Sequence, residues 1–159
     1  MNNEAALSGS GPGAGETTGR HLVAVIALWL LRLVTVAALA VDAYVHADLA
    51  PGYDAVRKSL SQGELFRVES GAAALAALLL VLLGTRRTVW LFAFLVAAGG
   101  LGAVLLYRYV DVGAFGPLPS MYEPVWYTEK TVSAVFEGIG AFTALVGLLT
   151  AHFLATRRR

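Results

Sequence analysis

Hydrophobic residues are gathered along this chain of 159 residues in four long blocks, which short polar segments separate. Each block is close to the roughly 20 residues that an α-helix needs to cross the hydrocarbon core of a bilayer. The pattern therefore predicts an all-α fold, a bundle of four transmembrane helices. The expected spans are residues 22–45, 65–83, 89–106 and 132–153.

The polar segments predict how the spans begin and how they are connected. The sequence SQGE at 61–64 fits a capping box, so we expect the second helix to begin at about residue 62. The tight link GTRRT at 84–88 predicts an antiparallel hairpin of the second and third helices. The Gly-, Ser- and Pro-rich residues 1–20 predict a disordered tail, before a transmembrane domain over 21–156 and a basic end at 157–159.

Charged residues outside the blocks predict the direction of the bundle. One side carries almost only arginines, and the other side mixes both signs. The positive-inside rule then places both termini in the cytoplasm and residues 46–64 and 108–130 outside it, as in a multi-pass protein of the plasma membrane. The arginines of the basic side are Arg20, Arg86, Arg87, Arg157, Arg158 and Arg159.

Composition supports the bilayer as solvent and excludes several functions. The chain is 57% hydrophobic and 14% charged, whereas soluble domains carry about 25% charged residues. Its net charge of +1 gives no bulk basic character for nucleic acid. It contains no cysteine, which excludes disulfides, thiol catalysis and thiolate metal sites.

Four polar residues of the first span follow helical steps on one face, namely Arg32, Thr35, Asp42 and His46. We expect this stripe to face the bundle interior together with Glu69 of the second span and Glu137 of the fourth, because charges avoid lipid. Depth along the helices makes Glu137 the expected partner of Arg32. Two interpretations stay open: a polar cavity for a proton, ion or small ligand, or ion pairs that fix helix register.

Motifs for chemistry are scarce. There is no P-loop, dinucleotide-binding or zinc-protease motif, so the sequence favours a protein without catalytic activity. A metal site would have to use His46 with Asp42 one turn before it, but one histidine with carboxylates is a poor structural zinc set. We therefore expect His46 to be hydrogen-bonded and predict neither a metal nor a cofactor. Haem ligation by two histidines fails, because His21 and His152 lie at the opposite side of the membrane.

The segment 108–130 differs from its surroundings, with three prolines and several aromatic residues in a plain Ala- and Leu-rich chain. Gly-Pro and Pro-Leu-Pro sequences stiffen it, so we expect an ordered cap over the mouth of the bundle. Aromatic residues on an ordered surface are typical of protein interfaces. The candidate partner-binding residues of the cap are Tyr109, Tyr122, Trp126 and Tyr127.

The bias towards Ala, Gly, Arg and Val, with the sequences HADLAP at 46–51 and GPLPSMYEPVWY at 116–127, resembles uncharacterised four-helix membrane proteins of high-GC Gram-positive bacteria. The resemblance covers the bundle and implies no activity. We expect a non-catalytic scaffold or accessory subunit that binds a membrane-protein partner, or a second copy of itself, through the cap. The alternative is a small proton- or ion-coupled transporter with a polar cavity in the outer half of the bundle.

Overall fold

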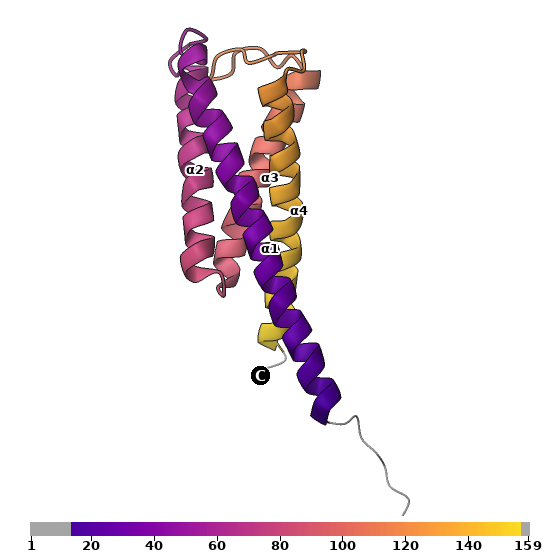
Figure 1. Ribbon diagram of the computed structural model, residues 1–159. Helices are drawn as coiled ribbons and strands as arrows, with labels where there is room; N and C mark the ends of the chain where they lie inside the picture. The colour runs from indigo at the N-terminus through magenta and orange to yellow at the C-terminus, as the bar shows by residue number, and fades with distance from the viewer. Residues whose placement is uncertain (1–13, 157–159) are drawn as a thin grey trace, which may run out of the picture.

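The computed structural model describes residues 14–156, which form four long α-helices and one short 3-10 helix (Figure 1). No β-strand occurs in this part of the chain. All four α-helices are long and apolar enough to cross a membrane, as in a multi-pass membrane protein. The predicted all-α fold with four spans is thereby confirmed. The helices are α1 (Ala14–Leu49), α2 (Gln62–Leu83), α3 (Arg87–Tyr109) and α4 (Thr128–Thr156), with the 3-10 helix η1 at Ala50–Tyr53.

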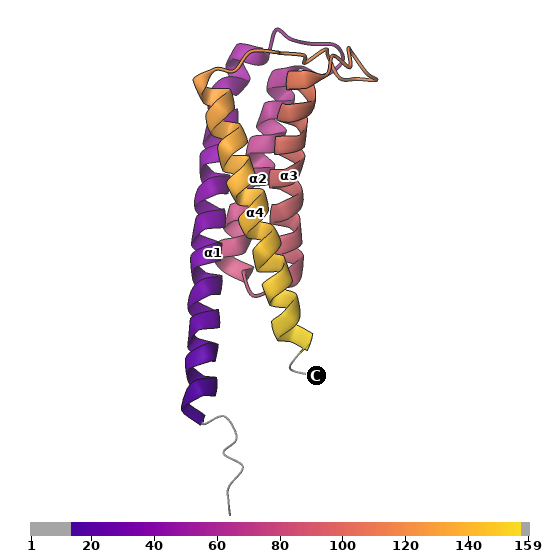
Figure 2. The same ribbon diagram turned by 90° about the vertical axis from the view of Figure 1, so that its right-hand side faces the viewer.

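The four helices run up and down as one bundle, in which α1 and α3 each pack against α2 and α4 (Figures 1 and 2). The short connection between α2 and α3 lies at one end, called here the turn end. The segments 50–61 and 110–127 both cross the other end, called here the cap end. The predicted antiparallel hairpin of the second and third helices is therefore present.

Helix α1 is longer than the bundle is tall. Its 36 residues span about 54 Å at about 1.5 Å per residue, and its N-terminal part extends well beyond the turn end (Figures 1 and 2). It begins at Ala14, inside the region predicted as a tail, because a helix continues past its apolar run wherever the backbone can still hydrogen-bond. Residues 1–13 of the predicted tail and the basic end 157–159 lie outside the described residues.

The predicted capping box at the start of α2 is confirmed. The Glu64 backbone N–H donates to the Ser61 hydroxyl at 3.0 Å, and the Ser61 backbone N–H donates to the Glu64 carboxylate at 2.6 Å. The two bonds satisfy donors that a helix start leaves unpaired. Helices α3 and α4 extend a turn beyond their apolar runs, to Tyr109 and from Thr128, which shortens the connection between them.

The interior of the bundle is built largely from alanine and glycine, and this lets the helix backbones approach closely. At Gly140 of α4, an added Cβ would meet the Cβ atoms of Ala97 at 3.3 Å and Ala38 at 3.6 Å. Large apolar side chains point outward instead, as expected for a surface solvated by lipid. Val68, Leu82 and Phe142 are each at least 65% exposed.

The cap segment (residues 108–130) lies across the cap end, as predicted (Figures 1 and 2). Backbone hydrogen bonds tie it down: the Leu60 N–H donates to the Pro117 carbonyl at 3.1 Å, and the Glu123 N–H donates to the Tyr107 carbonyl at 3.0 Å. Gly116 takes a φ of 54°, a left-handed conformation that glycine adopts at little cost, where the chain turns. The cap is therefore attached to both α3 and the segment before α2.

Candidate functional site

The polar stripe of α1 faces the bundle interior at three of its four positions. Thr35, Asp42 and His46 are at most 6% exposed. Residues spaced by three, four and seven along an α-helix share one face, and α2 and α4 cover that face of α1. The predicted inward orientation is therefore confirmed for these three residues.

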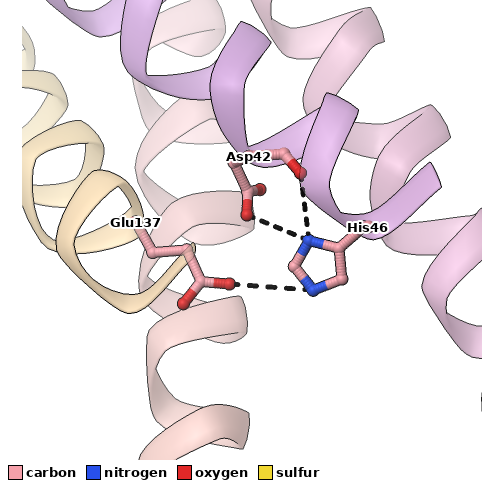
Figure 3. Close-up of side chains that lie close together, drawn as sticks. All are labelled: Asp42, His46 and Glu137. Atoms are coloured by element: carbon pink, nitrogen blue, oxygen red, sulfur yellow. Dashed lines mark hydrogen bonds and ion pairs between the residues drawn. The ribbon is translucent and has the colours of Figure 1, made fainter. Parts of the chain in front are cut away.

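Asp42, His46 and Glu137 converge between α1 and α4 beneath the cap (Figure 3). The His46 Nδ1 lies 3.0 Å from the Asp42 carboxylate and 3.1 Å from the Asp42 backbone carbonyl. On the other side of the ring, Nε2 faces the Glu137 Oε1 at 4.0 Å. One donor atom from each of the three residues fits within a mutual distance of 4.8 Å. Metal-ligand candidates from helices far apart in the sequence thus form one compact group.

Two further polar residues complete this group. The Ser133 hydroxyl lies between the two acids, 3.1 Å from Asp42 Oδ1 and 3.2 Å from Glu137 Oε1, and can donate to one of them at a time. Glu69 reaches the same place from α2, because a Cβ added at Gly100 would lie 2.5 Å from Glu137 Oε1 and 3.1 Å from Glu69 Oε1. We call Asp42, His46, Glu69, Ser133 and Glu137 the acidic cluster.

The acidic cluster is not neutralised by its surroundings. Three buried carboxylate oxygens have no hydrogen-bond partner: Asp42 Oδ2, Glu69 Oε1 and Glu137 Oε2. Within residues 22–151, no lysine or arginine forms an ion pair with any of the three acids. One imidazole cannot balance three ionised carboxylates even when the imidazole is protonated. Buried carboxylate oxygens normally find hydrogen-bond partners, so these three oxygens need a physical explanation.

Arg32 does not belong to the acidic cluster, and its predicted ion pair with Glu137 is wrong. Its guanidinium donates to the Val81 carbonyl in the last turn of α2 and lies 4.5 Å above the Trp29 ring. A helix C-terminus leaves carbonyls unpaired and attracts cations, and both effects stabilise Arg32 at this position. Depth along the helices had predicted Glu137 as the partner, but α1 extends past the turn end, and the contact with Val81 places Arg32 at that end of the bundle.

The candidate cap residues divide into two kinds. Tyr109, Tyr122 and Trp126 are 65%, 41% and 38% exposed, so each of these aromatic side chains is accessible. Tyr127 instead points inward, where its hydroxyl lies 2.7 Å from the Tyr53 hydroxyl and donates to Glu123 at 3.3 Å. Burial raises the pKa of Tyr127 well above its ordinary value, so this hydroxyl keeps its proton and can donate.

Lysine at the start of α4 fastens the cap from the other side. The Lys130 ammonium, 8% exposed, lies 2.5 Å from the Glu123 backbone carbonyl and 3.6 Å from its carboxylate. Tyr53 also donates to the Glu123 carboxylate at 3.0 Å. Glu123 is therefore held by η1 and α4 together, in contrast to the acids of the acidic cluster.

No protein-family model matches the chain, and comparison with curated proteins and with solved structures found no match either. The acidic cluster and the cap are therefore interpreted from their own chemistry.

Proposed function

We propose that this multi-pass membrane protein is a small ion-coupled carrier that binds a cation in the acidic cluster beneath the cap. The convergence of Asp42, His46 and Glu137, with two of their carboxylate oxygens buried and unpartnered, carries the proposal. A scaffold needs no such group. The geometry thus favours the transporter alternative over the scaffold as the first interpretation.

Energetics supports a bound cation rather than a purely structural network. A charged residue at the centre of a bilayer costs about 2.5–3.5 kcal/mol on insertion scales. A structural network would offset this cost with a lysine or arginine of the chain. The acidic cluster has no such partner, and a cation from solution supplies the missing charge.

The proposed orientation has the cap end facing outward in the plasma membrane and both termini in the cytoplasm, on the charge asymmetry of the loops. The chain contains no cysteine, so single cysteines report without background. Ser59→Cys and Ser120→Cys should react with an impermeant thiol reagent on intact cells, and Thr85→Cys should not. All three positions are exposed, which makes labelling depend on the side of the membrane alone. Labelling of Thr85→Cys only would reverse the orientation.

Flux measurements test the carrier directly. Purified protein in vesicles should dissipate a cation gradient, and Glu137→Gln should abolish this flux because the substitution keeps the shape and removes the charge. Glu129→Gln, at an exposed position in the first turn of α4, is the matched control and should transport normally. Since four helices rarely enclose a pathway alone, we propose that the carrier works as a homo-oligomer. Equal flux from both variants would exclude this function.

The scaffold remains a second candidate, because the aromatic side chains of Tyr109, Tyr122 and Trp126 are exposed at the cap end. Aromatic anchors carry much of the binding energy of protein interfaces. In this case Trp126→Ala should release a co-purifying membrane protein, whereas Glu137→Gln should retain it. If neither variant changes what co-purifies, the cap serves only to cover the bundle.

A further inference from the structure

We infer that the cation is a divalent first-row transition-metal ion, bound by His46 Nε2 and the Glu137 carboxylate, with Asp42 positioning the imidazole and Glu69 as the adjacent acid. This inference rests on the proposed function, since it names the chemical class of ion for the same site. It departs from the sequence-based expectation that His46 is only hydrogen-bonded, because the sequence did not bring Glu137 to the imidazole.

The orientation of His46 selects which nitrogen is free. Nδ1 lies within hydrogen-bond distance of two Asp42 acceptors, the backbone carbonyl at 3.1 Å and the carboxylate at 3.0 Å. A backbone carbonyl can only accept, and so can an ionised carboxylate, so this arrangement favours the tautomer in which Nδ1 carries the proton and donates it. In the neutral ring Nε2 then presents its lone pair to Glu137 (Figure 3). Metal-binding histidines are commonly held in this way, with the second nitrogen donating to a carboxylate or a backbone carbonyl.

The separation between His46 and Glu137 fits a bridging ion better than a hydrogen bond. Nε2 lies 4.0 Å from Glu137 Oε1, beyond the ~3.2 Å limit of an N–H···O hydrogen bond. Transition-metal bonds to imidazole nitrogen and carboxylate oxygen are about 2.0–2.2 Å long. Two such bonds to one ion span the observed gap at an open angle. Glu137 is 1% exposed, and its second oxygen, Oε2, has no partner.

The donor types select the class of ion. Mg²⁺ and Ca²⁺ prefer sites made of oxygen atoms alone. Imidazole nitrogen suits Zn²⁺ and other first-row transition ions, and carboxylates are accepted by Zn²⁺ and Mn²⁺ as well. One imidazole with acids from α1, α2 and α4 is therefore a mixed nitrogen and oxygen site. A divalent ion also reduces the excess negative charge of the acidic cluster more than a monovalent ion or a single proton does.

Binding of Mn²⁺ to the full-length protein in detergent tests the inference. The chain is purified without a histidine tag and with His21→Gln and His152→Gln, which leaves His46 as the one imidazole. We expect one Mn²⁺ per chain, with electron-spin-echo modulation from a single imidazole nitrogen. Zn²⁺ should displace the ion, and Mg²⁺ in large excess should not. Absence of Mn²⁺ and Zn²⁺ binding, or a bound ion without nitrogen coupling, overturns the inference without the need for any cluster variant.

Variants then assign the roles. Removal of a residue that supports a metal-binding histidine weakens metal binding roughly 10–100-fold. His46→Gln and Glu137→Gln remove proposed ligands themselves, so each should weaken Mn²⁺ binding by at least that factor. Asp42→Asn should fall within that range and keep the nitrogen coupling, because the backbone carbonyl still holds Nδ1. Glu129→Gln is the control and should bind normally. If Mn²⁺ binding fails while Glu137-dependent flux of Na⁺ or protons persists, the carrier stands and the metal is excluded; if both fail, the carrier is excluded too.

Discussion

The turn end of the bundle and the acidic cluster beneath the cap differ in whether their polar groups have hydrogen-bond partners within the chain. At the turn end, polar groups find partners within the chain: the Arg32 guanidinium donates to the Val81 carbonyl, and the Trp90 indole N–H donates to the Gly84 carbonyl at 2.8 Å. At the cap end, carboxylate oxygens of Asp42, Glu69 and Glu137 are buried without partners. Both ends are made by the same four Ala- and Gly-rich helices, and they differ in the polar side chains that each end places in the interior.

This difference in hydrogen bonding between the two ends supports the proposed function. Every buried polar group left unpaired costs free energy. The unpaired acids at the cap end therefore lower the stability of the bundle, and this cost calls for a role other than stability. A hydroxyl layer marks the boundary, where Thr35 donates to Thr143 at 2.8 Å and Thr143 can donate to the Ile139 carbonyl at 2.8 Å. The polar groups named at the turn end are thus satisfied within the chain, whereas the acidic cluster keeps carboxylate oxygens that the proposed cation would complete.

The largest effect should come from a methyl group added beside the acidic cluster. In Gly100→Ala the new Cβ would lie 2.5 Å from Glu137 Oε1 and 3.1 Å from Glu69 Oε1, so both carboxylates must move. Carboxylate ends move at little cost to the fold, and we expect Mn²⁺ affinity to fall more than about tenfold, with stability nearly unchanged. Gly99→Ala is the matched control, because its Cβ meets nothing within 4 Å. Equal Mn²⁺ binding by the two variants would contradict the placement of the site.

A methyl group at the turn end should act on stability instead. In Gly147→Ala the new Cβ would overlap the ring of Trp90, a rigid side chain that is 1% exposed. Overpacking of this kind costs about 1–3 kcal/mol, which unfolding in mixed micelles can measure. Gly138→Ala, whose nearest neighbour is a Leu101 methyl at 3.9 Å, should not destabilise the protein. Folded Gly147→Ala protein should still bind the cation; lost binding with unchanged stability would reverse the roles of the two ends.

A double-mutant cycle should separate the two ends energetically. Arg32→Leu removes a charged hydrogen bond to a helix C-terminus, and we expect a loss of about 1 kcal/mol. Glu137→Gln acts in the acidic cluster, which shares no partner with Arg32. The two effects on the unfolding free energy should therefore add within about 0.5 kcal/mol. A larger coupling energy in the same mixed-micelle titration would show that Arg32 and Glu137 interact, against the structure.

The smallest effect should come from the exposed ion pair at the cap end. The hydrogen bonds from Arg67 hold the pKa of Asp54 below its ordinary value. The stabilisation by this pair is therefore present above the pKa of an unfolded aspartate and is lost as the pH falls through the lower pKa of the folded protein. Asp54→Asn should lower stability slightly at neutral pH and leave it unchanged in acid. A difference from the wild type that persists in acid would show that Asp54 acts through packing rather than charge.

Sequence by itself determined the fold class, the four spans and several local features. Hydrophobic length is sufficient to predict a membrane helix, because the bilayer imposes one thickness on every span. The capping box of Ser61 and Glu64 was equally predictable, since its partners are three residues apart. So was the inward face of Thr35, Asp42 and His46, because helical periodicity places them together before any neighbour is known.

Only the tertiary structure decided which charges meet. The lateral order of the helices and their relative depth are not contained in any one span, so the sequence matched Glu137 with Arg32. In the folded bundle α1 extends past the turn end, so Arg32 lies at the C-terminus of α2 and His46 lies beside Glu137. Ser133 lies four residues before Glu137, a spacing that already places the two on one helical face. Gly100 gave no distinctive signal as a member of the site, because a glycine that makes room for a carboxylate looks like any other glycine of a membrane helix. Contacts between helices depend on the shapes of all four packed faces at once, and for that reason the acidic cluster appears only in three dimensions.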